Sequence, residues 1–114
     1  MKKDRSKVPV INLDLDEEFT KNSYKLLREL LKIFVKEKPS IQFEINEAFH
    51  SHQKQKLDDK LHKLYGSCVY CGLNRLKESI IDLKESINSD NYSEKLLKTF
   101  NEEIEYVVEE AKKI

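Results

Sequence analysis

The chain has few residues that interrupt helices, with only two glycines and two prolines among 114 residues. It has no tryptophan, and it lacks the run of about 18 apolar residues that a membrane-spanning helix requires. Few tight turns are therefore available, and no long stretch alternates apolar and polar residues as a strand would. Because leucine, lysine, glutamate and isoleucine are common, the sequence predicts an all-α fold in a single domain.

The charges also exclude some classes of partner. The 21 basic residues balance the 21 acidic ones, whereas a nucleic-acid-binding domain needs a net basic surface. Two cysteines three residues apart do not suggest a secreted disulfide scaffold, and "MKKDRSKVPV" lacks the apolar core of a signal peptide. We expect a cytoplasmic domain that contacts neither nucleic acid nor membrane directly and is monomeric in isolation.

The domain organisation follows from breaks in the apolar pattern. Residues 1–11 are predicted to form a flexible basic tail or linker, and residues 12–114 a helical domain. A short helix at 14–19 and a second at 22–36 should precede a break at "EKPS", with Pro39 in the first turn of the next helix. Four long helices beginning near 39, 54, 73 and 93 are then expected to form an antiparallel up-down four-helix bundle, with the two N-terminal helices covering one end or side.

Each expected helix has one apolar stripe, and Gly72 and Ser93 are predicted to end one helix and cap another. The apolar residues at helical spacing are Leu26, Leu27, Leu30, Leu31, Phe34, Ile41, Ile45, Ala48, Phe49, Leu57, Leu61, Leu64, Cys68, Cys71, Leu73, Leu76, Ile80, Leu83, Ile87, Leu97, Phe100, Ile104, Val107 and Ala111.

The stretch "LHKLYGSCVYCG" contains a histidine that does not belong to its stripe. At about 100° per residue, the stripe lies within roughly 40° of Leu57, whereas His62 lies about 140° and Gly66 about 180° away. Val69 and Tyr70 share this outward side with Asp59. An imidazole, a missing side chain and two apolar residues on a solvent face predict a docking surface, in which Gly66 lets a partner approach His62.

The run "LHKLYGSCVYCGLNRLKESIIDLK" resembles the phosphohistidine helix and following helix of histidine-containing phosphotransfer (HPt) domains. The matching positions are His62, Leu64, Gly66, Ser67, Gly72, Leu73 and Leu76. Within that family it is most similar to the HPt domain at the C-terminal end of BarA/GacS-type hybrid sensor kinases. The sequence departs from the family at Tyr65, where many members have lysine or arginine, and at Lys84, where several have glutamine or glutamate.

The resemblance implies a carrier rather than a kinase. His62 would accept a phosphoryl group from an aspartate of a hybrid kinase's receiver domain and pass it to a response-regulator aspartate. Asp59, Lys63, Tyr65, Gly66, Ser67, Val69, Tyr70 and Lys84 would contact the phosphoryl group or the partner. No cofactor of its own is expected, since no phosphate-binding loop or acidic metal motif is present; Mg²⁺ should lie on the receiver domain.

Several residues also allow a different interpretation. Cys68 and Cys71 could form a redox or zinc pair, but they lie on the apolar stripe without further ligands, which favours buried small side chains. His50 and His52 could be half of a metal site, but a polar connection is favoured. A protein-interaction adaptor of the same fold, with no phosphotransfer, remains the alternative function. The chain is either free-standing or the cytoplasmic end of a membrane-bound sensor histidine kinase.

Overall fold

The computed structural model describes residues 10–11 and 21–114, with side chains from residue 25 onward in the second range. The expected helix at 14–19 lies outside the described residues. The four helices of the described chain are α1 (Lys21–His50), α2 (Lys54–Cys71), α3 (Asn74–Asn88) and α4 (Glu94–Ala111). No described helix is long and apolar enough to cross a membrane.

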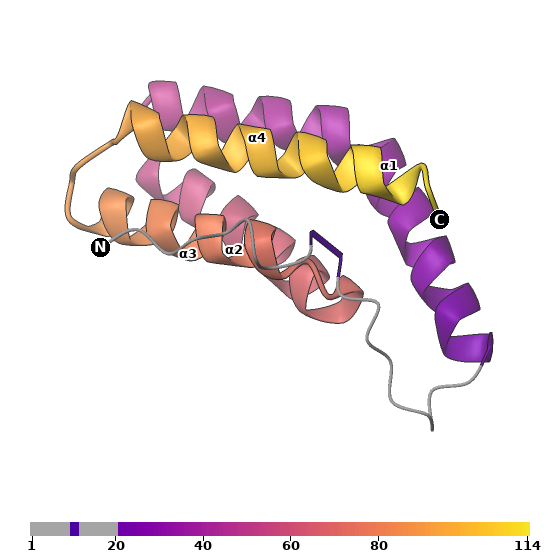
Figure 1. Ribbon diagram of the computed structural model, residues 1–114. Coiled ribbons are helices and arrows are strands. Elements are labelled where there is room, and N and C mark those ends of the chain that lie inside the picture. The colour runs from indigo at the N-terminus through magenta and orange to yellow at the C-terminus, as the bar shows by residue number, and fades with distance from the viewer. Residues whose placement is uncertain (1–9, 12–20) are drawn as a thin grey trace.

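The helices form one antiparallel bundle. Each helix packs against the next along the chain, and α4 packs back against α1. Figure 1 shows α1 and α4 side by side above α2 and α3, with the α3–α4 connection at one end. All four helices contribute to a single apolar core, which includes Ile45, Leu61, Ile80 and Phe100. The predicted all-α bundle is confirmed.

The first helix differs from the prediction. The segments expected at 22–36 and from 39 onward form one continuous helix, α1, with Pro39 inside it. Proline leaves the carbonyl of Val35 without its helical hydrogen bond and costs about 3 kcal/mol in a helix interior. Core residues such as Phe34 and Ile45 are buried on both sides of Pro39, so packing outweighs this local cost. The change of direction along α1 in Figure 1 is what an internal proline causes.

Most of the predicted apolar stripes are buried. All five stripe residues of α2 lie in the core, as do Leu73 and the four stripe residues that follow it. Leu26 is an exception, because its side chain is 60% exposed while Leu27 is buried. The predicted tail at 1–11 is described only at its last two residues. Val10 is partly buried against the core and Ile11 is buried.

Two helix ends match the prediction. Gly72 follows α2 with φ 67° and ψ 33°, a left-handed conformation that favours glycine. The N–H of Leu73 then donates to the carbonyl of Cys68 at 3.0 Å, so the chain turns directly into α3 with Leu73 in the core. At the other end, the Ser93 hydroxyl accepts a hydrogen bond from the N–H of Leu96 at 3.2 Å and caps α4.

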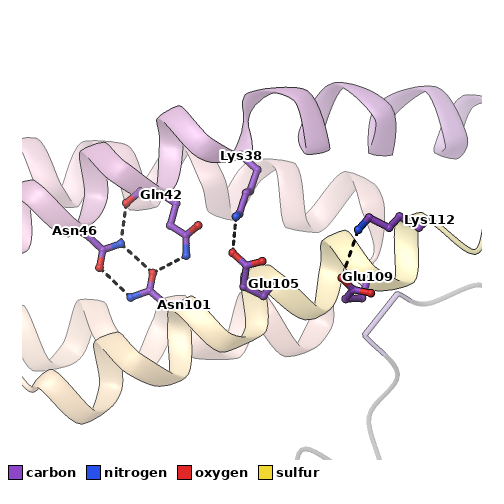
Figure 2. Close-up of polar contacts among 7 residues, drawn as sticks. All are labelled: Lys38, Gln42, Asn46, Asn101, Glu105, Glu109 and Lys112. Carbon is purple, nitrogen blue, oxygen red and sulfur yellow. Dashed lines mark hydrogen bonds and ion pairs between the residues drawn. The ribbon is translucent and has the colours of Figure 1, made fainter.

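Side-chain amides join α1 to α4, as Figure 2 shows. Gln42 and Asn46 each donate to Oδ1 of Asn101 at 2.9 Å, and Asn101 donates back to Asn46 at 2.8 Å. Lys38 of α1 forms an ion pair with Glu105 of α4 one turn further along. These contacts fix the register of α1 on α4. Neither of these helices carries His62, which lies on α2.

Candidate functional site

The imidazole of His62 lies on the solvent-exposed side of α2, near the middle of the helix. Its neighbours Leu61 and Leu64 are buried, so the helix presents its leucines to the core and the histidine to water. Among the described residues, His62 forms no hydrogen bond or ion pair. In the described part of the chain, the exposed imidazole thus has no protein partner that an incoming reactant would have to displace.

Gly66 lies one turn after His62 and leaves the helix surface bare. A Cβ atom added at Gly66 would meet nothing within 4 Å, so no neighbouring group requires glycine there. The residue is helical and has no positive φ, so the backbone does not require glycine either. Glycine costs about 1 kcal/mol relative to alanine inside a helix. What it provides is unobstructed space next to the imidazole.

Apolar side chains continue the exposed face toward the end of α2. Val69 is 57% exposed and Tyr70 is 83% exposed, and both are among the large hydrophobic residues that the core does not cover. Asp59, Lys63 and Ser67 are also exposed. We call the five outward residues predicted for docking, namely Asp59, His62, Gly66, Val69 and Tyr70, the His62 face.

A shallow pocket of about 290 Å³ lies beside His62, between α2 and α3. It is lined by His62, Tyr65, Ile81, Lys84, Glu85 and Asn88. The structure thus brings Lys84 to His62 across the helix pair. Tyr65 turns partly inward, where it packs against the core, and contributes to the pocket wall rather than to the outer face.

The pocket includes residues that the sequence did not assign to the site. Ile81 and Asn88 are exposed on α3, where they follow the same helical spacing as Lys84 and Glu85. The 3–4 spacing of these residues beside the Ile80 and Leu83 stripe is the signal that could have identified them. Their position next to His62 depends on how α3 packs on α2.

The lysines near His62 differ in their partners. Lys84 Nζ lies 3.7 Å from Oδ1 of Asp58, and both side chains are partly exposed. Lys60 forms an ion pair with Glu44 of α1, away from the pocket. The hydrogen bond from Lys60 and the positive charge of the lysine lower the pKa of the Glu44 carboxyl. Lys63 is exposed and has no ion pair among the described residues.

The cysteines do not form a reactive site. Both are free thiols whose side chains are buried in the core. Burial raises the pKa of the Cys68 thiol to about 12 and also raises the pKa of Cys71. A thiol that stays protonated is a poor nucleophile and metal ligand. The described residues include no group of three or more histidine, cysteine, aspartate or glutamate side chains that could hold a metal ion.

The other two histidines are engaged with neighbouring side chains. His50 Nε2 lies 3.1 Å from Oε1 of Glu94, which joins the end of α1 to the start of α4. The ring of His52 stacks on Tyr92 with centroids 4.1 Å apart and planes 6° apart. The first contact thus joins the ends of two helices, and the second joins the α1–α2 connection to the α3–α4 connection. The expected polar connection is present, and these histidines have structural partners that His62 lacks among the described residues.

Comparison with known proteins finds a signalling kinase. The chain is 29% identical over 92 residues to signal transduction histidine-protein kinase BarA of Shigella flexneri and of two Escherichia coli strains, K12 and O157:H7. The match covers 78% of this chain but only 10% of BarA. No family model and no solved structure matches. The chain is thus similar to a small part of BarA.

Proposed function

We propose that this chain is a phosphorelay carrier in two-component signalling, with His62 as the residue that carries the phosphoryl group. The observation that supports it is an exposed imidazole in mid-helix, beside open space at Gly66 and a pocket that contains Lys84. The similarity to part of a histidine-protein kinase supports the same role. The resemblance of the run around His62 to HPt domains gives the proposal its chemistry.

The transfer is a displacement at phosphorus. A neutral imidazole nitrogen of His62 attacks the aspartyl phosphate of a receiver domain with its lone pair and forms a P–N bond. The P–O bond to the aspartate breaks, and its electron pair stays on the carboxylate. The other ring nitrogen keeps its proton, so no separate proton acceptor is needed. Transfer to a response-regulator aspartate reverses these steps.

The chain's own contribution is access and positioning. Phosphoryl transfer depends mainly on alignment and on stabilising the charge of the transferred group. Buried leucines on the opposite side of α2 anchor the helix in the core, so the backbone that carries the imidazole has a defined place in the bundle. Gly66 leaves room for the donor to approach in line. In this proposal the receiver supplies the Mg²⁺ ion and this domain supplies the nucleophile.

The receiver is proposed to bind across the His62 face and the adjoining edge of α3. Val69 and Tyr70 offer exposed apolar area beside the reactive group, and Ile81 extends it on α3. Transient signalling interfaces are small and need only a few such contacts. Addition of a receiver domain should therefore perturb amide signals of residues 59–70 and 80–85 most, and signals near Ile104 to Ala111 least.

The direct test uses labelled phosphate. A receiver domain loaded with labelled acetyl phosphate is mixed with the protein, and the protein is then assayed for label that is acid-labile and base-stable, as phosphohistidine is. Peptide mass spectrometry under mildly alkaline conditions should place the phosphate on His62. Absence of label with a panel of receivers, together with retained receiver binding, would instead indicate an adaptor of the same fold.

A further inference from the structure

An ion pair lies directly beside the proposed phosphohistidine. Asp58 precedes His62 by four residues on α2, so the two side chains share one helix face roughly 5–6 Å apart at their Cβ atoms. Lys84 reaches from α3 to Asp58, with Nζ 3.7 Å from Oδ1, while its side chain also lines the His62 pocket. Lys84 is therefore paired with Asp58 and also lines the same pocket as the imidazole.

The charges of the pocket make this lysine distinctive. Among the residues that line it, Lys84 is the one cation and Glu85 the one carboxylate. Lys63 follows His62 directly and is exposed, but it does not line the pocket. A phosphoryl group on the pocket side of the imidazole would have Lys84 as its nearest cation from α3.

The Asp58–Lys84 contact is loose enough to exchange. At 3.7 Å it is longer than a hydrogen bond, and partly exposed ion pairs of this kind contribute little to stability. The flexible four-carbon stem of lysine lets its ammonium group move between neighbouring anions. A protein-bound phosphoryl group carries nearly two negative charges near pH 7, whereas the Asp58 carboxylate carries one. The phosphoryl group is thus the stronger partner for Lys84.

We propose that Asp58 is a positioning residue of the phosphohistidine site: it holds the Lys84 ammonium beside His62 and releases it to the phosphoryl group once His62 is phosphorylated. This inference rests on the proposed function. It implies that phosphorylation of His62 is less favourable than it would be without Asp58. Lys84 stabilises the phosphorylated state, and Asp58 competes for the same ammonium in the unphosphorylated state. The pair thereby sets how far phosphoryl transfer to His62 proceeds.

The test is the equilibrium extent of transfer from a phosphorylated receiver domain to three variants. Lys84→Met should lower the phosphorylated fraction relative to receiver by about two- to fivefold, and Asp58→Asn should raise it by a similar factor. In the double variant, the Asp58→Asn effect should shrink strongly, because Asp58 acts through Lys84. No change in either single variant, or an equal Asp58→Asn effect with and without Lys84, would overturn the proposal.

Glu44→Gln is the matched control. It removes the carboxylate of the Lys60–Glu44 pair, which also joins α2 to a neighbouring helix and is exposed to a similar degree. It should leave the extent of transfer unchanged, whereas a merely structural role of Asp58 would make the two variants behave alike. Melting curves of all variants should confirm that each is folded.

A second measurement needs no receiver. Potassium phosphoramidate phosphorylates imidazoles chemically, with a new P–N bond formed and ammonia released. The nitrogen signal of the Lys84 ammonium and the carboxyl carbon signal of Asp58 should both shift on treatment, and both should stay in place in His62→Gln. An unmoved Lys84 signal would overturn the inference. Failure of transfer from receivers with these shifts present would instead count against the proposed function alone.

Discussion

The two sides of α2 differ in residue type, in burial and in the reactivity of their side chains. The inward side consists of leucines and cysteines with almost no exposed surface, in contact with the other helices. The outward side carries a histidine, a glycine and two exposed apolar residues. On the inward side, packing contributes stability and suppresses reactivity, as the raised pKa of Cys68 shows. On the outward side, reactivity is available because packing is absent.

The largest expected effect is on the reactive group. His62→Gln should abolish phosphoryl acceptance and leave the melting temperature nearly unchanged, because an exposed side chain contributes little packing. His50→Gln and His52→Gln are the matched controls, since those rings contact Glu94 and Tyr92 at the end of the bundle. Labelling by a phosphorylated receiver measures all three. Label that persists in the His62 variant would assign the carrier role to another residue.

The next largest effect is on the free energy of unfolding, which should depend on which side of α2 is substituted. Leu64→Ala should lower the free energy of unfolding by about 2–5 kcal/mol, because it leaves a cavity in the core. Lys63→Ala, one residue earlier and exposed, should change it by less than about 0.5 kcal/mol. Urea denaturation followed by circular dichroism gives both values. The contrast between the sides of α2 would break down with a tolerant Leu64 and a sensitive Lys63.

Alkaline pH should lower the stability of the protein through a buried residue on the inward side of α2. Cys68 ionises near pH 9 in an unfolded chain but only near 12 in the folded protein, because burial disfavours the thiolate. The folded state therefore holds the proton more tightly, and its stability should fall by about 1.4 kcal/mol per pH unit between these values. Denaturant titrations at pH 9 to 11 measure the slope. Cys68→Ala should make it shallower, and an identical slope would refute this origin.

The last comparison concerns Gly66, where stability and phosphoryl transfer should respond differently to the size of the new side chain. Gly66→Ala should stabilise the protein by up to about 1 kcal/mol, since the added methyl group meets no neighbour within 4 Å. Gly66→Gln should fold equally well but slow phosphoryl transfer, because its side chain would occupy the space beside His62. Rapid-quench kinetics with a labelled receiver compare the two variants. A glutamine variant that transfers at the normal rate would show that the donor does not need this space.

Local patterns sufficed for much of the fold and for part of the site. The 3–4 spacing of apolar residues predicted the core sides of α2 and α3, and Gly72 and Ser93 marked helix ends through their own backbone and hydroxyl chemistry. The outward position of His62 followed from the same spacing. Pro39 led to the wrong prediction of a helix break, because its unfavourable effect is visible in the local sequence. The burial of Phe34 and Ile45 offsets that effect, but it depends on the other helices and is not visible there. Leu26 misled because its apolar pattern does not reveal where α1 has a neighbour to pack against.

The sequence by itself determined the helical class, the inward stripe of α2 and the exposure of His62, since each depends on residues a few positions apart on one helix. Only the tertiary structure placed Lys84 and Ile81 at the pocket of His62 and paired Lys84 with Asp58. It also turned Tyr65 partly into the core. These contacts join residues some twenty positions apart, or depend on a neighbouring helix. Their geometry is set by how α3 packs on α2, which no single-helix periodicity specifies.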